Sequence, residues 1–501
     1  MTILSSKASR SIHGGLSLPR HKPGLPSDGH IPRLALPDQL IIPLLDYHKN
    51  ILRPLVETGQ YIRLGQAVAK GIIAPASGVV QSLSPRAIIH PSQKHALCAT
   101  LTVDRAAQES LESAVHAPLD LLTEQRLEQC AIVGLGGAGF STAQKLAGRA
   151  IHTLVINAVE CEPGISCDES LLISDAHGVV QAIHALIQFS QCQRCVIATE
   201  DDKPEALEAL RAALAEMQWQ QAVKPELLQL QPVYPTGAER PLIQRITGQK
   251  IPYPKKPVNL GIACLNVATV YAAGRARRGL PLVSRILTIS GSKARNPCNV
   301  HVRLGTRVAD VLQQTGNAPD RQTQVRAGGP LSGFELLHTD APVCATSNCL
   351  SLEAVAPKPQ PQPCIRCGEC SKVCPVKLLP QQLFWYTEND ELDNAERFGL
   401  SSCIECGCCD VVCPSSISLT QLFRYGKSAA ADKSRQTTEA ETARQRYQLR
   451  EERLAAVESI KQQKRQEAQK RLTEGSSAIT DALQRARERR RHSKPDTDNR
   501  P

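Results

Sequence analysis

Eight cysteines in the last third of the chain stand in two runs of identical spacing. The first run reads Cys-x2-Cys-x2-Cys-x3-Cys-Pro over residues 364–375, and the second repeats this pattern over residues 403–414. Three closely spaced thiolates followed by a fourth are typical ligands of a [4Fe–4S] cluster, which takes four thiolates. Two such runs predict two [4Fe–4S] clusters.

In two-cluster ferredoxins the fourth cysteine of each run binds the cluster of the other run. The spacing therefore predicts one ligand set of Cys364, Cys367, Cys370 and Cys413. It predicts a second ligand set of Cys403, Cys406, Cys409 and Cys374. Two zinc sites are the alternative, but zinc proteins pair C-x2-C motifs across a longer spacer and do not use such triplets. Cys408 fits no corner of a cluster and is expected to pack as a bystander, while the insert 377–402 is expected to be partly helical.

A second candidate site is a glycine-rich loop. Its glycines are Gly134, Gly136, Gly137 and Gly139. Apolar residues 131–133 predict a short buried strand before the loop, and a helix is expected to begin near Ser141. Bare amides and a helix N-terminus form a cradle for an anion. A tight turn between strand and helix without a ligand explains such a loop about equally well.

Acidic residues follow the next predicted strand, 152–156, which Asn157 closes. Glu160 and Glu162 lie where α/β folds place their ligands, beyond the carboxyl end of a strand. Two acids beside an anion cradle indicate contacts to ribose hydroxyls or to a carboxamide. Two cysteine pairs in this region, Cys161 with Cys167 and Cys192 with Cys195, are expected to be small packing residues.

These motifs resemble the flavoprotein subunit of respiratory complex I. Residues 134–142 with Lys145 are similar to its G-R-G-G-A-G-F-P-T-G-x-K loop, and residues 157–164 to its N-A-D-E-G-E-P-G segment. Residues 234–239 loosely match its Y-x-x-G-E-E, and residues 265–269 match its N-N-V-E-T. The resemblance implies bound FMN and NAD(H). Four family residues are replaced, by Leu135, Val159, Ala238 and Leu265.

The order of the motifs, ending in two ferredoxin runs, more closely resembles the C subunit of the Rnf-type (Rsx-type) ion-translocating electron transport complexes, over roughly residues 35–425. That resemblance implies a role for each matching residue. The four loop glycines would let the backbone approach the flavin and its phosphate, Lys145 would neutralise phosphate, and Asn157 and Asn266 would hydrogen-bond the flavin. Phe140 would cover the nicotinamide, and Glu160, Glu162 and Glu239 would bind the pyridine nucleotide. For Glu239, a surface ion pair with Arg240 or Arg245 is the alternative.

The positive charge lies in the two ends of the chain. Of the net charge of +11, residues 1–40 with five basic and two acidic side chains carry +3, and residues 427–501 with nineteen and twelve carry +7. Such ends are commonly just solvated, but they also suit anionic lipid or an acidic partner. Aromatic residues make up 3% of the chain, which argues against nucleic-acid binding. We expect neither a signal peptide nor a membrane-spanning helix.

We expect a multidomain α/β protein. Its parts are an extended arm (1–40), a lipoyl-like sandwich barrel (41–104), an α/β domain for FMN and NADH (125–280), a β-grasp module implied by the resemblance (285–345), a two-cluster ferredoxin module (357–425) and a basic tail (427–501). Lys70 is expected away from the hairpin tip that carries the cofactor in lipoyl domains. The tail is expected to form a helix from a capping box at Thr438 to Leu472, a second short helix at 479–491 and a disordered end.

The cofactors together imply electron transfer. A flavin takes two electrons as hydride and releases them singly, whereas a [4Fe–4S] cluster takes one. The resemblance implies a peripheral subunit on the cytoplasmic side of the inner membrane that exchanges electrons between NAD(H) and ferredoxin or another low-potential carrier, with further subunits as partners. The alternatives are a non-catalytic electron conduit, the flavin subunit of a soluble NAD-linked hydrogenase or formate dehydrogenase, and a redox-sensing nucleic-acid binder.

Overall fold

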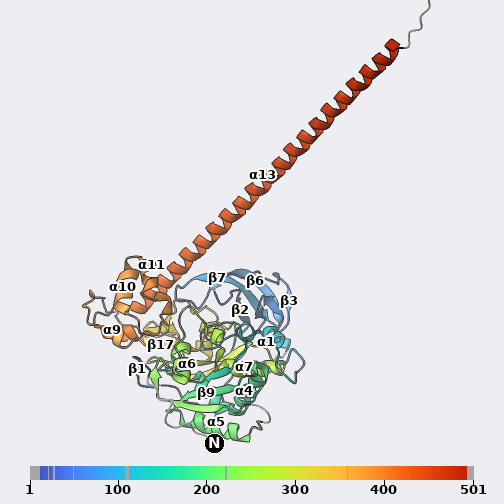
Figure 1. The fold of residues 1–501 in the computed structure, drawn as a ribbon. Helices are drawn as coiled ribbons and strands as arrows, with labels where there is room; N and C mark the ends of the chain where they lie inside the picture. Colours follow the sequence, from blue (N-terminus) through green and yellow to red (C-terminus); the bar gives the residue numbers. More distant parts are fainter. Residues whose placement is uncertain are drawn as a thin grey trace, which may run out of the picture. The chain divides into compact units, whose positions relative to one another are not determined.

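The computed structural model describes residues 12–492, except 21, 26–28, 49, 108–111, 220–222 and 358. The chain divides into two units, residues 1–426 and 427–501. Within the first unit, Figure 1 shows blue N-terminal strands, a green α/β region and a group of short orange helices. The expected disorder after Arg491 falls almost wholly on residues 493–501, which lie outside the described residues.

The N-terminal domain is a small antiparallel β structure. Strands β2 (Gln39–Pro43), β7 (His95–Val103), β6 (Gly78–Ala87) and β3 (Tyr61–Ile62) form one sheet in that order, and β4 (Ala67–Ala69) pairs with β5 (Ile72–Ile73). Leu40, Val68 and Leu101 are fully buried between these strands. Lys70 lies in the turn between β4 and β5, so its expected position away from a hairpin tip is wrong. It still lacks the acidic neighbours of a lipoyl-lysine.

The α/β domain is built on a parallel sheet with the strand order β10-β9-β8-β12. Its strands are β8 (Thr153–Asn157), β9 (Arg194–Glu200), β10 (Glu226–Leu230) and β12 (Ile262–Asn266). Its helices are α1 (Glu124–Gln129), α2 (Thr142–Leu146), α3 (Cys167–Ser174), α4 (Ala176–Ser190), α5 (Pro204–Glu216), α6 (Glu239–Thr247) and α7 (Val267–Arg277). The strands are apolar on both faces, as a sheet covered by helices requires.

Alternate strand residues point to two separate cores. Leu154 and Ile156 pack with α4 and α7 on one face of the sheet, whereas Val155 and Val196 pack with α6 on the other.

The predicted strand 131–133 does not form. Ala131 has a φ of 51°, and Val133 makes only an isolated bridge to Ser141. The glycine loop therefore connects α1 to α2 and does not extend a strand of the sheet.

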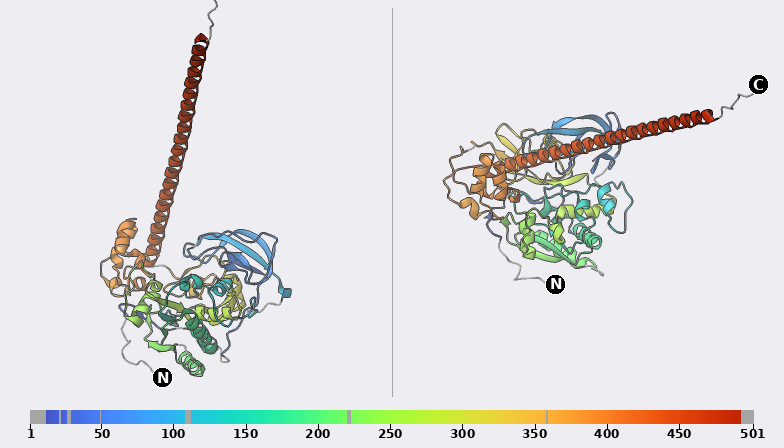
Figure 2. Two further views of the ribbon diagram at one scale, coloured as in Figure 1. Left: turned by 45° about the vertical axis from the view of Figure 1, so that its right-hand side comes forward. Right: turned by 45° about the horizontal axis from the view of Figure 1, so that its top comes forward.

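The described part of the N-terminal arm runs across this domain. Strand β1 (Leu16–Ser17) pairs with β11 (Val233–Tyr234). Further along, Arg20 forms ion pairs with Glu169 at 2.9 Å and with Asp202 at 3.1 Å. Figure 2 shows the first unit from two further directions, and in its left view the blue strands of the N-terminal domain lie above the green α/β region.

A second sheet follows, with the strand order β14-β13-β17-β15-β16. Its strands are β13 (Ser284–Ser290), β14 (Cys298–Arg303), β15 (Thr323–Ala327), β16 (Phe334–Glu335) and β17 (Cys349–Ala354), and α8 (Val308–Gln314) packs on them. The two neighbours β13 and β17 run parallel, while the outer pairs are antiparallel.

The cysteine-rich segment is made of short helices. These are α9 (Glu369–Lys372), α10 (Pro380–Glu388), α11 (Leu392–Arg397) and α12 (Cys408–Val411), followed by the start of α13 (Leu419–His492). The expected helical insert is confirmed, because α10 and α11 lie within residues 377–402. Leu383, Leu400 and Phe423 form the small apolar core beneath the cysteines.

Helix α13 is one continuous helix of 74 residues. The predicted start at Thr438 and the break before Ile479 are therefore wrong. Thr438 lies inside the helix, where its hydroxyl donates to the Ser434 carbonyl as a residue in mid-helix does. Residues 427–437, which precede Thr438, include good helix formers such as Ala, Lys, Arg and Gln, so the capping pattern has no helix end to cap.

Among the described residues, no single helix combines the length and the apolar character that crossing a membrane would need. Helices α3 and α4 reach that character only when taken together, and they are bent by 97° at their junction.

Candidate functional site

The eight run cysteines surround two separate hollows. One hollow is lined by Cys364, Cys367, Cys370 and Cys413. The other is lined by Cys374, Cys403, Cys406 and Cys409. The fourth cysteine of each run thus lies with the first three of the other run, which is the grouping predicted from the spacing. Cys408 also lines the second hollow. It was expected to be a packed bystander outside the ligand set, and it lies directly beside that set.

The two cysteine loops repeat one backbone shape at a spacing of 39 residues. Arg366 and Glu405 have a φ of 56° each, and Gly368 and Gly407 have φ values of 78° and 76°. A left-handed residue between the cysteines turns the chain so that successive thiols face one centre, and the glycine then starts a short helix, α9 or α12. Each loop is therefore shaped to converge three sulfur atoms, which fits the donor set of a cluster.

The second hollow lies against the α/β domain. The Tyr234 hydroxyl donates to the Cys406 carbonyl at 2.6 Å. A Cβ atom on Gly407 would lie 2.7 Å from the Leu331 carbonyl oxygen, so only glycine permits this approach. Tyr234 belongs to β11, which leads into the segment with Gly237 and Glu239. The second cysteine group is thus attached to a segment of the predicted flavin site.

The glycine loop is closed by its own backbone. The Gly134 amide donates to the Phe140 carbonyl and the Gly139 amide to the Gly134 carbonyl. Gly137 and Gly139 have φ values of 102° and 66°, which residues other than glycine rarely adopt. A Cβ atom on Gly136 would lie 3.1 Å from the Asn266 side chain, so this glycine lets the loop approach the end of β12. The predicted helix start is confirmed, because the Ser141 hydroxyl caps α2.

Asn157 and Asn266 lie side by side, because they are paired at the carboxyl ends of the parallel strands β8 and β12. The Asn157 side chain donates to the Gly237 carbonyl at 2.8 Å. The Asn266 side chain accepts from the first amides of α7 and donates to Asp168 at 2.6 Å. Both asparagines are therefore held in fixed orientations at the edge where parallel sheets place ligands.

Lys145 completes this edge. Its ammonium lies 2.7 Å from Glu239 and 2.6 Å from the Cys264 carbonyl. The alternative partners for Glu239, Arg240 and Arg245, make other contacts: Arg240 donates to the Ile251 and Lys255 carbonyls, and Arg245 donates to the Thr236 hydroxyl. The structure thus brings together the loop glycines, Lys145, Asn157, Glu239 and Asn266.

Phe140 lies on the other side of the loop. Its ring packs edge-on against Tyr47 of the N-terminal domain, with centroids 4.7 Å apart, and the Lys256 ammonium lies 5.2 Å from its centre. Phe140 is half-buried in these contacts. A covering role for Phe140 would require a ligand that reaches the boundary with the N-terminal domain.

The expected role of Glu160 in binding nucleotide conflicts with the structure. Glu160 is only 8% exposed, and its carboxylate accepts from the Cys167 thiol and from the amides of Asp168 and Glu169 at 3.1 and 3.2 Å. These amides begin α3, so Glu160 caps that helix. Its carboxylate is already used by the protein and is not free for a ribose.

The carboxylate of Glu162 is also held by hydrogen bonds within the protein, which differs from its expected role. Its carboxylate accepts from the Leu331 and Ser332 amides at 3.0 and 2.8 Å and from the Ser332 hydroxyl. It therefore holds the loop after β15, the same loop that meets Gly407 beside the second cysteine group. We interpret Glu162 as a connector between domains and not as a contact to pyridine nucleotide.

A buried ion pair supports this segment from below. Lys203 and Glu200 are 0% and 1% exposed at their side chains and lie 2.6 Å apart. The Glu160 amide donates to Glu200 at 3.0 Å, and Lys203 donates to the Ala158 carbonyl. The pair therefore fixes the turn after β8. No motif pointed to these residues, although a Glu and a Lys three positions apart at a strand end were visible in the sequence.

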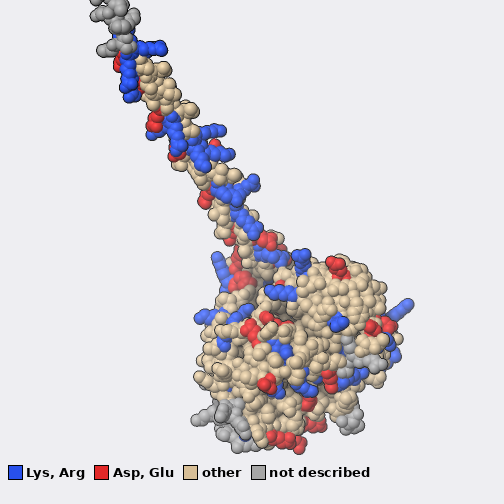
Figure 3. Space-filling model, turned by 90° about the vertical axis from the view of Figure 1, so that its right-hand side faces the viewer, with Lys and Arg blue, Asp and Glu red and all other residues tan. Residues whose placement is uncertain are grey.

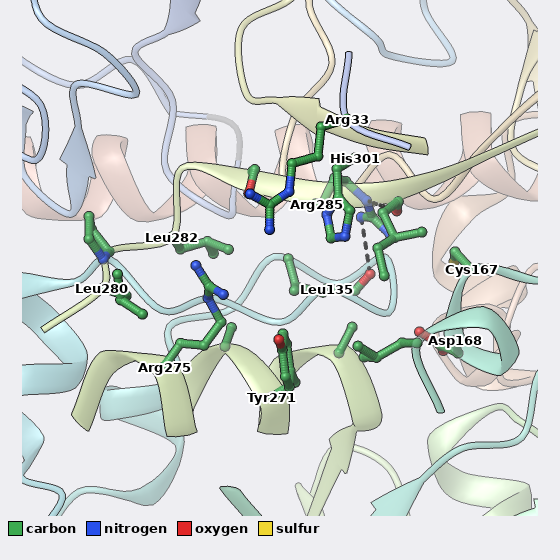
Figure 4. Close-up of a pocket in the computed structure, with 16 residues that line it drawn as sticks. Arg33, Leu135, Cys167, Asp168, Tyr271, Arg275, Leu280, Leu282, Arg285 and His301 are labelled. Carbon is green, nitrogen blue, oxygen red and sulfur yellow. Dashed lines mark hydrogen bonds between the residues drawn. The ribbon is translucent and has the colours of Figure 1, made fainter. Parts of the chain in front are cut away.

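A small cavity of about 60 Å³ lies behind the glycine loop. Figure 4 shows Tyr271 and Arg275 on α7 along one wall, Arg285 reaching the loop, and Asp168 with Cys167 at one end. Arg285 donates to the carbonyls of Leu135 and Ala345, and so joins the loop to the second sheet.

Burial shifts the ionisation of groups around this cavity. Burial, and then the charge of Glu160, raise the pKa of Asp168 to about 7. Burial lowers the pKa of His301 to about 4. Burial raises the pKa of the Cys161 thiol to about 12 and that of the Cys167 thiol well above its usual range, which favours packing over thiolate chemistry for both.

Cys192 and Cys195 are both buried in the core that α4 covers. This agrees with their expected packing role, since they lie among apolar side chains.

Three family descriptions match consecutive parts of the chain. Residues 10–106 match the RnfC barrel sandwich hybrid domain, residues 127–275 the Nuo51 FMN-binding domain, and residues 363–417 the 4Fe-4S dicluster domain. The protein is therefore a multidomain α/β protein with a barrel-sandwich domain, a flavin-type domain and a ferredoxin-like domain.

The C subunit of the ion-translocating oxidoreductase complex of Yersinia pestis biovar Antiqua is 36% identical over 487 residues, which cover 94% of this chain and 77% of that protein. The chain belongs to the family of these C subunits. Family members of the same name from Pseudomonas aeruginosa and Vibrio cholerae are 38% and 36% identical over 89% and 93% of this chain. The chain spans 59% and 62% of the length of these two C subunits.

Among solved structures, an NAD+-reducing [NiFe]-hydrogenase in the H2-reduced state superposes on this C-subunit family member with a TM-score of 0.43 and 17% sequence identity. The superposition covers 60% of this chain and 58% of the hydrogenase chain.

Proposed function

We propose that this C-subunit family member is a peripheral electron-transfer subunit of a membrane-bound, ion-translocating complex. It exchanges electrons between NAD(H) and ferredoxin or another low-potential carrier through FMN and two [4Fe–4S] clusters. Its partners are the other subunits of that complex, and it works on the cytoplasmic side of the inner membrane. The observation that carries this proposal is the attachment of one cysteine-lined hollow, through Tyr234, to the segment that leads to Glu239.

Two clusters are proposed because each hollow is lined by the four thiols of one predicted ligand set, with Cys408 as a fifth thiol in the second hollow. The four cysteines of each group come from both runs, so each cluster would tie the two loops together. The group with Cys406 contacts the α/β domain and is proposed to exchange electrons with the flavin. The group with Cys413 is proposed to be the next carrier.

FMN is proposed to lie at the carboxyl ends of β8 and β12. Gly134, Gly136, Gly137 and Gly139 would allow backbone amides to approach it, Lys145 would lie near its phosphate, and Asn157 and Asn266 would hydrogen-bond it. Bound FMN takes two electrons from a hydride and passes them on singly. Lys145 and Glu239 now neutralise each other, so an incoming phosphate would compete with Glu239 for the ammonium.

Pyridine nucleotide is proposed to contact Glu239, whose side chain is 40% exposed. Phe140 is proposed to cover the nicotinamide from the side of the N-terminal domain. The sheet of residues 284–354 is proposed to be a β-grasp module, supported by its strand order and by the parallel pair β13 and β17.

A non-catalytic electron conduit is the second candidate, and one observation favours it. The residues that replace polar family residues, Leu135, Val159 and Leu265, are 5%, 7% and 4% exposed. They are packed in apolar cores, so these three positions offer no polar side chain to a flavin. In that case clusters would be present and the flavin site would be inactive.

Anaerobic reconstitution with iron, sulfide and FMN separates these functions. Protein that retains flavin after desalting, and whose flavin and cluster absorbance bleach with NADH, supports the proposal. Clusters without retained flavin support the conduit. Zinc in place of iron and acid-labile sulfide would exclude both.

A further inference from the structure

The last part of α13, residues 461–491, has its ionised side chains sorted by face. All of these residues are exposed, and they lie in one uninterrupted helix. Figure 3 shows Lys and Arg side chains in blue along α13 with fewer Asp and Glu side chains in red. The arrangement of the two signs around the helix axis carries more information than the net charge.

The acidic residues of this segment form one row. They are Glu467, Glu474, Asp481 and Glu488, at intervals of seven residues. Seven residues are close to two turns of an α-helix, so these four carboxylates lie one above the other on the same side. No other Asp or Glu occurs between residues 461 and 491.

The apolar residues form a row on the opposite side. Leu472, Ile479 and Leu483 are 74%, 64% and 59% exposed, and their spacing of seven and four residues places them on one stripe. Leu454 and Tyr447 extend the stripe toward the start of the helix and are also exposed.

Five of the ten basic residues of this segment accompany the stripe. At about 100° per residue, those within a quarter turn of Leu472 are Lys461, Lys464, Arg465, Arg487 and Arg490. Arg471, Arg489 and Arg491 lie on the flanks between the stripe and the acidic row, and Lys470 and Arg485 lie near the acidic row. One face of the segment is thus apolar and cationic, and the opposite face carries all of its carboxylates.

We propose that residues 461–491 bind the surface of an anionic lipid membrane, with the Leu472 stripe toward the lipid. A lipid surface of that kind offers a plane of negative headgroups above an apolar layer, which matches cationic and apolar groups on the same face. The carboxylates would point to water, away from the headgroups. The proposal does not depend on electron transfer.

A second copy of the helix does not fit this face. In a coiled coil, charges beside the apolar stripe pair with opposite charges of the partner helix. Here the charged residues within a quarter turn of the stripe between 461 and 491 are all cationic, so two copies would repel each other along their contact. The stripe is also narrow, so the attraction to lipid rests mainly on charge and is expected to weaken steeply with salt.

Vesicle flotation with the full chain tests the proposal. The probes are vesicles of phosphatidylcholine alone and vesicles that contain phosphatidylglycerol, at low and at high salt. We expect binding to the anionic vesicles at low salt, and loss of that binding at high salt or on the neutral vesicles. No binding to anionic vesicles would overturn the proposal.

Two variants of equal charge test the face. Arg465→Gln with Arg490→Gln removes two charges beside the stripe, whereas Lys470→Gln with Arg485→Gln removes two charges near the acidic row. All four side chains are exposed, so both variants are expected to fold. The first variant should weaken binding to anionic vesicles about 10- to 30-fold, and the second by a factor of about three or less. Equal weakening would show attraction by net charge alone and would overturn the assignment of the face.

A matched pair of double variants tests the apolar part of the face. Leu472→Gln with Ile479→Gln changes the stripe, and Leu449→Gln with Ile460→Gln changes two exposed apolar residues away from it. Only the first pair should reduce binding to anionic vesicles. A different result would contradict the proposal: RNA competes with the vesicles for this face, and the Leu472→Gln, Ile479→Gln variant keeps its lipid binding. That result would indicate a site for polyanions in general.

Discussion

The two candidate redox regions are built in different ways. The cysteine segment places all eight thiols within residues 364–413, and two loops of the same backbone shape form both groups. The edge at the ends of β8 and β12 collects its residues from positions as far apart as Gly134 and Asn266. The first region depends on local spacing, and the second depends on how a whole domain packs.

This difference determines which changes each region tolerates. In the cysteine segment, one lost thiol removes one of the four ligands that a cluster requires. At the strand ends, each polar group is held by another, as Asn266 is by Asp168 and Lys145 by Glu239. Replacing residues there is expected to change affinity and stability by degrees.

The largest effect is expected from Cys413→Ser. We expect it to abolish the cluster of the group with Cys364 although Cys413 belongs to the second run, and to lower iron and sulfide content by about half. Cys408→Ser should leave both contents unchanged. Iron and sulfide assays with electron paramagnetic resonance of the reduced protein provide the check. If Cys413→Ser and Cys403→Ser lost the same signal, the crossed grouping would be wrong.

Lys203→Met is expected to destabilise the α/β domain strongly. It leaves Glu200 buried without a counter-charge, which costs about 3–5 kcal/mol of unfolding free energy. Anaerobic denaturant unfolding followed by circular dichroism measures this cost. The double variant Glu200→Gln with Lys203→Met should recover most of the loss, because no ion stays buried. A single variant as stable as the parent would show that the pair does not support the turn after β8.

Asn266→Ala is expected to have a moderate effect at the strand ends. It removes the cap of α7, worth about 1 kcal/mol, and the donor to Asp168. The dissociation constant for FMN should rise while the cluster absorbance of the same sample stays unchanged, and that unchanged absorbance is the internal control. Equal loss of FMN affinity and of cluster absorbance would mean that the strand ends and the cysteine segment do not act independently.

A further expected effect concerns pH. Because burial raises the folded pKa of Asp168 to about 7, above its ordinary value of 3.8, the folded protein holds a proton that the unfolded chain releases. Stability should therefore fall as pH rises from about 4 to about 7 and level off above that range. Asp168→Asn should flatten this slope in denaturant unfolding at several pH values. An unchanged slope would assign it to other groups.

Much of the cysteine segment could be predicted because a cluster motif is local. Thiols separated by two residues can reach one centre only through a tight loop, so the spacing in the sequence already limits the geometry. The alternation of strands and helices from Thr153 to Asn266 was likewise visible, since buried parallel strands are short apolar runs. The position of Asn157 at a strand end follows from the same pattern, whereas the end of β12 at Asn266 came from the structure.

What the sequence determined by itself, then, was the grouping of the cysteines and the order of the α/β elements. Only the tertiary structure decided that Glu160 caps α3 and that Glu162 holds the loop at Leu331, because hydrogen bonds to distant amides leave no pattern along the chain. It also decided that the glycine loop joins two helices, since a strand at residues 131–133 would need a neighbouring strand to pair with.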